Sequence, residues 1–189
     1  MLPAKRWDMR VCGIDGGVRG GLAVVAIEDG TAPALIACID TPVAGSGAKE
    51  RVDPVAIRDW VLVHRPEHAF IERAQAMPRQ GASSGFKYGR AVGVIETAIM
   101  LAGVPLTIVE KKFHGLRGKD KEGARLRALM LFPNATAGMF ARKKDHGKAE
   151  AALIALFGGR TSINGTGRAA VHPPRLDDLS GPGLPCRFS

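Results

Sequence analysis

Two acidic residues of this chain each end an apolar run that is typical of a β-strand. Asp15 closes the segment Cys12–Asp15 and precedes two glycines, and Glu72 closes the run Ala69–Glu72. A single aspartate at a strand end is common and indicates little. Two neighbouring carboxylates repel each other, so either one takes up a proton or both coordinate a cation. Because carboxylate oxygens are hard ligands, such a pair favours Mg²⁺ or Mn²⁺.

A second group of chemically useful side chains opens the last helical segment, Lys143–Glu150. His146 and Glu150 are four residues apart and share one helix face, and Asp145 lies at the helix entry, where it can point to the same cleft. His146 is then a further metal ligand or an orienter of attacking water. The alternative is that Asp145 only caps the helix, Glu150 is solvated and His146 bonds to the backbone. The joint pattern, four acidic residues where strand ends and a helix start come together, favours one acidic site made of Asp15, Glu72, Asp145 and Glu150.

The positive charge of the chain is unevenly distributed. Lys and Arg number 27 against 18 Asp and Glu, a formal net charge of +9. The segment Lys111–Lys148 alone holds eleven basic residues against three acidic ones. A concentrated basic surface releases counterions from a phosphate backbone and predicts nucleic-acid binding, whereas the alternative is a merely solvated basic face. We expect DNA contacts from Lys111, Lys112, Lys119, Lys143 and Lys144.

A polar stretch between Gln75 and Tyr88 offers small and polar groups that suit contacts with phosphates or base edges. The alternative is an ordinary flexible loop. The candidate DNA contacts in this stretch are Gln80, Ser83, Ser84 and Lys87.

The elements that position these residues follow from hydrophobic periodicity and from Gly and Pro punctuation. Three closely spaced strands predict an antiparallel meander, and strands then alternate with helices, in the order β-β-β-α-β-α-β-α-α. This is the order of the ribonuclease H architecture, an α/β fold with a five-stranded mixed sheet flanked by helices. Its first and fourth strands are neighbours, which places Asp15 beside Glu72. The expected strands are Arg10–Asp15, Gly21–Ile27, Ala34–Ile39, Ala69–Glu72 and Leu106–Val109, and the expected helices are Asp53–His64, Phe86–Ala102, Lys121–Phe132 and His146–Phe157.

Length and composition predict one domain over residues 1–158 and a flexible tail rich in Gly, Pro and Arg over residues 159–189. Hydrophobic residues make up 46% of the 189 residues, enough for a sizeable core. The apolar runs are too short to cross a bilayer, and no export or transit segment is recognisable at the N-terminus, so we expect no membrane contact. Three scattered cysteines do not predict a disulfide framework, and a reducing cytoplasm is expected.

The segment Lys143–Ala151 resembles the Lys-Lys-Asp-His-Gly-(Arg/Lys)-Ala-Glu-Ala motif of RuvC-type Holliday junction resolvases, in particular their monokaryotic chloroplast branch. The likeness extends over about residues 10–158 and includes Leu131–Pro133 and Ser84–Gly89. The polar stretch is shorter than in these relatives and lacks their neighbouring tryptophans, which leaves the preferred cleavage sequence open. The resemblance implies a structure-selective endonuclease that cuts four-way DNA junctions symmetrically. Because no transit segment is recognisable, a bacterial or phage setting is expected rather than an organelle.

By this resemblance, the four acidic residues bind two divalent ions that support in-line phosphodiester hydrolysis. Lys121 aligns with a lysine that the family places near the scissile phosphate, where a fixed cation stabilises developing charge; the alternative is that Lys121 only steers the DNA backbone. Symmetric cutting needs two active sites related by a two-fold axis, so a homodimer is expected. The candidate interface is the helix Phe86–Ala102, whose alternative role is core packing. Its apolar residues are Val92, Val94, Ile95, Ile99 and Met100.

Three other functions share features with this sequence. The run Gly13–Gly17 is similar to a phosphate motif of actin-like sugar kinases, but the chain lacks the length and the second motif that those enzymes need. A non-catalytic protein that binds branched DNA is disfavoured because all four acidic residues are present. A flap or packaging-related endonuclease with the same site stays open, because the way in which DNA is held sets substrate choice.

Overall fold

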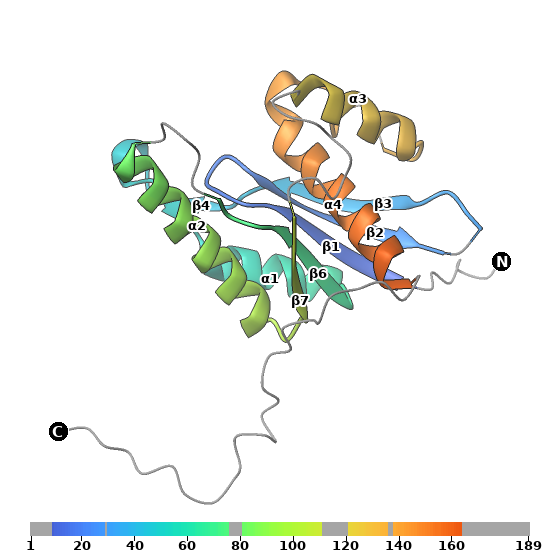
Figure 1. The fold of residues 1–189 in the computed structure, drawn as a ribbon, viewed down its shortest axis with the longest axis horizontal. Coiled ribbons are helices and arrows are strands. Elements are labelled where there is room, and N and C mark those ends of the chain that lie inside the picture. Colours follow the sequence, from blue (N-terminus) through green and yellow to red (C-terminus); the bar gives the residue numbers. More distant parts are fainter. Residues whose placement is uncertain (1–8, 29, 76–80, 111–120, 136–137, 164–189) are drawn as a thin grey trace, which may run out of the picture.

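The computed structural model describes residues 9–28, 30–75, 81–110, 121–135 and 138–163 (Figure 1). Its main sheet has five strands in the order β3-β2-β1-β6-β7. The sheet is mixed, because β1 is antiparallel to β2 and parallel to β6. This confirms the expected α/β fold and the expected pairing of the first long strand with the fourth. The strands are β1 (Met9–Asp15), β2 (Gly21–Ile27), β3 (Ala34–Asp40), β6 (His68–Glu72) and β7 (Leu106–Val109), and a separate hairpin pairs β4 (Val43–Ala44) with β5 (Arg51–Val52).

The helices begin where the sequence supplies suitable residues. Asp53 caps α1, since its side chain accepts hydrogen bonds from the backbone N–H groups of Val55 and Ala56 at 3.0 and 3.1 Å, and Pro54 fills the first helical position. Arg65 ends α1 in a left-handed conformation with φ 48°. The helices are α1 (Pro54–His64), α2 (Ala82–Leu101), α3 (Lys121–Leu131) and α4 (His146–Ile163), with short 3₁₀ turns η1 (Gly47–Lys49) and η2 (Lys143–Asp145).

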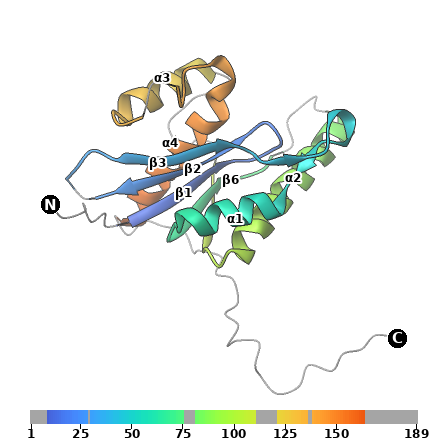
Figure 2. The ribbon, with the colours of Figure 1, turned by 180° about the vertical axis from the view of Figure 1, so that it is seen from behind.

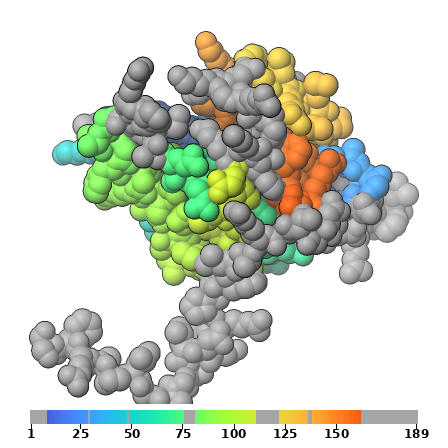
Figure 3. Space-filling view, viewed as in Figure 1, coloured from blue at the N-terminus to red at the C-terminus, as the bar shows by residue number. Residues whose placement is uncertain are grey.

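The sheet lies between two layers of helices (Figure 2). Side chains of β1 alternate between the layers, as the pleat requires. Val11 belongs to a core shared with α3 and α4, whereas Cys12 and Ile14 belong to a core shared with α1 and α2. In the space-filling view, α2 forms the outer surface on one side of the molecule, and α3 and α4 lie on the other (Figure 3).

Helix α4 packs against the sheet at unusually short range because small residues line the contact. A Cβ atom on Gly13 of β1 would lie 2.0 Å from the carbonyl oxygen of Ala151, so no larger residue fits there. A Cβ atom on Gly158 would lie 2.3 Å from the Phe70 ring. Because α3 covers its other side, α4 is buried almost all round. The position of this helix relative to β1 and β6 is therefore tightly defined.

Three local differences separate the structure from the sequence expectations. Helix α4 continues to Ile163, past residue 158, because Gly158 and Gly159 serve close packing rather than termination. Helix α2 begins at Ala82 instead of Phe86, since the small polar residues before Phe86 carry no hydrophobic period. The β4–β5 hairpin was not expected, because strands of two residues are too short to show alternation. The expected boundary of a tail at residue 159 falls inside α4, and residues 164–189 lie outside the described part of the chain.

Candidate active site at the carboxyl edge of the sheet

Asp15 and Glu72 end two adjacent parallel strands. The register of β1 and β6 pairs Ile14 with Ile71, so the next residues, Asp15 and Glu72, leave the sheet side by side. Asp15 is half-buried, and Glu72 is 8% exposed. The sequence expectation that these two carboxylates share one edge of the sheet agrees with this placement.

The chain that follows Asp15 turns closely enough to admit a helix end. A Cβ atom on Gly20 would lie 2.0 Å from the Asp15 carbonyl oxygen, and Gly17 has φ +114°, so both positions need glycine. The first turn of α4 sits directly on this turn, since a Cβ atom on Gly147 would lie 2.8 Å from the carbonyl carbon of Gly20. The β1–β2 connection therefore holds the N-terminus of α4, with His146 and Glu150, at the edge that carries Asp15.

Tyr88 of α2 packs over the same turn, and nearby negative charges affect the pKa of its phenol. A Cβ atom on Gly17 would lie 3.3 Å from the Tyr88 ring, and one on Gly16 would lie 3.6 Å from its hydroxyl oxygen. Burial and then the negative charges of Asp15, Glu72 and Glu150 raise the pKa of Tyr88 to about 12. The three carboxylates thus act on one phenol that stays protonated at neutral pH.

Tyr88 was not among the expected site residues, although it lies in the polar stretch that was assigned to DNA binding. A usable signal was present, because Tyr88 is the only tyrosine of the chain and directly follows Lys87. Its side chain lies over Gly16 and Gly17, whereas Lys87 is exposed.

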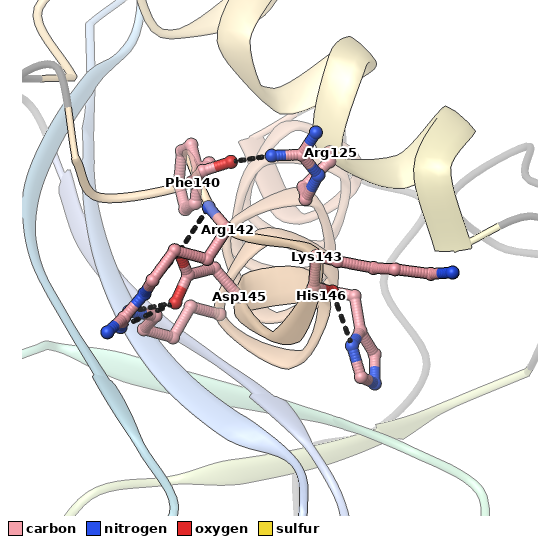
Figure 4. A network of polar contacts seen from close by, with 7 residues as sticks. Arg125, Phe140, Arg142, Lys143, Asp145 and His146 are labelled. Carbon is pink, nitrogen blue, oxygen red and sulfur yellow. Dashed lines mark hydrogen bonds and ion pairs between the residues drawn. The ribbon is translucent and has the colours of Figure 1, made fainter.

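His146 begins α4 one helical turn before Glu150, so both residues share the face of α4 near the turn that follows Asp15. Its Nδ1 lies 3.3 Å from the carbonyl oxygen of Lys143, an interaction whose donor depends on the tautomer (Figure 4). The imidazole is half-buried, which leaves part of the ring accessible.

Asp145 is placed differently from the other three acidic residues. Its side chain has no solvent exposure, and Oδ1 lies 2.9 Å from Arg142 Nη2 and 2.9 Å from Lys148 Nζ (Figure 4). Despite the opposing effect of burial, these two cations and their hydrogen bonds hold the pKa of Asp145 well below its usual value. The charges of Asp15, Glu72 and Glu150 thus act on the pKa of Tyr88, whereas Asp145 forms salt bridges with basic side chains.

The expected DNA contacts lie at several places on the surface. Ser83, Ser84 and Lys87 are exposed on the first turns of α2, and Lys143 and Lys144 are exposed in η2. Lys121 begins α3, and only its backbone belongs to the described part. Four expected contacts lie outside the described residues: Gln80, Lys111, Lys112 and Lys119.

The donor types at this edge fit a hard divalent cation. Three carboxylates and one imidazole are the oxygen and nitrogen donors that Mg²⁺ or Mn²⁺ accepts. Across the described ranges, no three His, Cys, Asp or Glu side chains converge on a single point that would hold an ion. Ion binding would therefore draw the side chains of Asp15, Glu72 and Glu150 closer together.

Comparisons with solved structures agree with this architecture. RuvC of Thermus thermophilus in complex with its Holliday junction substrate superimposes with a TM-score of 0.64 at 24% sequence identity, over 84% of this chain and 98% of that one. A second Thermus thermophilus RuvC structure gives a TM-score of 0.60 at 25% identity, over 84% and 98% of the two chains.

The fold is RuvC-like and belongs to the ribonuclease H-like type. The structural likeness is to RuvC and does not extend to the chloroplast branch that the segment Lys143–Ala151 resembles. No protein-family model matches the chain, and no curated protein sequence matches it. None of the helices in the described part has the length and hydropathy of a membrane span.

Proposed function

We propose that this chain is a divalent-metal-dependent endonuclease that resolves four-way DNA junctions. The observation that carries the proposal is the placement of Asp15 and Glu72 at the ends of adjacent parallel strands of a RuvC-like sheet, with the start of α4, which bears His146 and Glu150, packed on the turn that follows Asp15. The similarity to a RuvC whose structure contains a Holliday junction supports four-way DNA as the substrate. A relation to the chloroplast branch is part of the proposal and is supported only by the motif Lys143–Ala151.

The metal-binding role falls to Asp15, Glu72, Glu150 and His146, which would hold Mg²⁺ or Mn²⁺, two ions per site. Such ions supply an activated water and positive charge for in-line phosphodiester hydrolysis. The neutral phenol of Tyr88 adds a hydrogen-bond donor among groups that only accept. Because its pKa is about 12, this donor remains available throughout the physiological pH range.

The DNA-binding role falls to the basic groups around this edge. Lys87 lies on the turn of α2 that carries Tyr88, and Lys143 and Lys144 lie in η2, which directly precedes α4, so phosphates held by these lysines pass close to the carboxylates. Lys121 is proposed to stabilise charge on the scissile phosphate. The contacts expected from Gln80, Ser83, Ser84, Lys111, Lys112 and Lys119 belong to the same surface.

Paired cuts on a two-fold symmetric junction require two copies of this site, so the proposal includes a homodimer. The structure narrows the candidate interface on α2, because Val92, Ile95 and Ile99 are buried in the core of their own subunit. The side of α2 that remains for a partner carries Leu101, which is 72% exposed.

The proposal is tested with labelled four-way junctions, flap DNA and linear duplex, each incubated with Mg²⁺, Mn²⁺ or EDTA. We expect metal-dependent cutting of the junction and little cutting of the duplex. Preferential cutting of flaps would favour a repair or packaging endonuclease that uses the same carboxylates. Tight junction binding without any cutting would favour a non-catalytic branched-DNA-binding protein.

A further inference from the structure

A group of three charged residues, of which Asp145 and Lys148 are buried and Arg142 is exposed, lies immediately before and within the first turn of α4. Asp145, which has no solvent exposure, accepts from Arg142 Nη2 at 2.9 Å and Lys148 Nζ at 2.9 Å on Oδ1, and from the Arg142 backbone N–H at 2.8 Å on Oδ2 (Figure 4). Arg142 Nε approaches Oδ2 at 3.3 Å as well. We call Arg142, Asp145 and Lys148 the ion triad. Both carboxylate oxygens of Asp145 therefore already contact cationic side chains.

The ion triad joins the segment before α4 to the helix itself. The Asp145 backbone N–H donates to the Arg142 carbonyl oxygen at 2.8 Å, a hydrogen bond of η2. The salt bridge between Asp145 and Lys148 then connects η2 to the first turn of α4. On the other side, Gly147 packs against Gly20 with no room for a Cβ atom. The first turn of α4 is therefore held between the ion triad and the turn that follows Asp15.

This first turn carries the two helix residues that the proposed function assigns to metal binding, His146 and Glu150. We infer that Asp145 is a positioning residue, which through Arg142 and Lys148 fixes where α4 presents His146 and Glu150 to Asp15 and Glu72, and that it is not itself a metal ligand. The inference rests on the proposed function and corrects the simplest reading of the sequence.

Two physical arguments disfavour Asp145 as a ligand. A divalent ion at its oxygens would have to displace or approach a guanidinium and an ammonium group in a buried environment, where like charges repel strongly. In addition, each carboxylate oxygen of Asp145 already has two nitrogen partners from Arg142 and Lys148 within 3.3 Å.

The test separates a positioning role from a ligand role and from simple stabilisation. Binding of Mn²⁺ to the full chain without DNA is measured by electron paramagnetic resonance of the free ion, and kcat and KM for junction cleavage are measured on folded protein. The variants are Asp145→Asn, Arg142→Gln and Lys148→Met, with Arg142→Lys as the charge-conserving rescue. Glu122→Gln is the control, because it breaks the Glu122–Arg125 salt bridge, which has the same i,i+3 spacing.

We expect Asp145→Asn, Arg142→Gln and Lys148→Met each to weaken Mn²⁺ binding by about 10-fold and to lower kcat, as loss of an outer-sphere support does in metal sites. Arg142→Lys restores most of both quantities, and Glu122→Gln leaves both unchanged. Neither Arg142→Gln nor Lys148→Met removes an oxygen atom that could bind Mn²⁺. If these two variants weaken Mn²⁺ binding as much as Asp145→Asn does, Asp145 acts by positioning.

Two results would overturn the inference while the proposed function stands. If Asp145→Asn weakens Mn²⁺ binding and Arg142→Gln and Lys148→Met do not, Asp145 is a ligand. If all three variants lower the melting temperature but leave Mn²⁺ binding and kcat unchanged, the ion triad only stabilises the fold. Failure of the unsubstituted chain to bind Mn²⁺ would overturn the proposed metal chemistry and this inference together.

Discussion

Replacement of Tyr88 by Phe should change the response of this protein to alkaline pH. Burial and the carboxylates Asp15, Glu72 and Glu150 raise the pKa of Tyr88 from 10.0 to about 12 in the folded state. The unfolded chain lacks these surroundings and ionises near 10. Above that pH the unfolded state loses the phenolic proton first, so the contribution of Tyr88 to stability is complete below pH 10 and is lost as the pH rises through 12.

The expected magnitude follows from the size of the pKa shift. Two pKa units correspond to at most about 2.7 kcal/mol of unfolding free energy, and at pH 11, halfway through the interval, at most about 1.4 kcal/mol is lost, because solvent screens the partly exposed phenol. Tyr88→Phe has no phenolic proton and escapes this loss. Because Tyr88 is the only tyrosine, all other alkaline titrations are common to both proteins.

The assay is urea unfolding of both proteins at a series of pH values from neutral to 11, with the difference in unfolding free energy plotted against pH. We expect the difference to be constant up to about pH 9 and then to shift by at most roughly 1.4 kcal/mol in favour of Tyr88→Phe by pH 11. Addition of Glu72→Gln to both proteins should reduce the shift, because one negative charge is gone. A difference that stays constant up to pH 11 would refute the placement of Tyr88 among the three carboxylates.

The other predictions concern the chemistry and the DNA. Glu72→Gln and Glu150→Gln should each lower the cleavage rate by about 100-fold or more while junction affinity in EDTA is retained; normal cleavage by either variant removes that residue from the site. Lys121→Ala should lower kcat by about 10²–10³-fold with a smaller effect on affinity, and equal losses would reduce Lys121 to a steering role. Phe86, 73% exposed beside Lys87, should stack on an accessible base, so Phe86→Ala weakens junction binding at least about 5-fold; Val63→Ala, with 75% exposure on α1, is the matched control, and equal effects would refute the assignment.

The sheet and the strand-end carboxylates were predictable from the sequence because their signals are local. Each strand is a short apolar run with its own punctuation, and the position of Asp15 and Glu72 at the strand ends fixes their proximity once β1 and β6 are paired. Asp53 and Pro54 likewise indicate the start of α1. These features depend on residues that are close in sequence or on a topology with few alternatives.

The features that sequence reasoning missed depend on tertiary contacts. Gly158 looks like a helix terminator until the Phe70 ring is seen against it. Asp145 has the position of a metal ligand in the motif, but whether its side chain faces Glu72 or Lys148 is decided by the rotation of the helix start, which a linear pattern does not show. Tyr88 lies near the turn that follows Asp15 only because α2 packs over that turn, a contact that the sequence does not show.

The central claim is that this chain makes two coordinated cuts at a four-way junction, and a supercoiled plasmid with an extruded cruciform tests it most directly. The reaction is started with Mg²⁺ under conditions in which each plasmid binds one dimer. Coordinated cuts within one binding event release linear plasmid without an accumulating nicked circle, and this is the predicted result. Accumulation of nicked circles alone, or no metal-dependent cutting at the cruciform, would contradict the account.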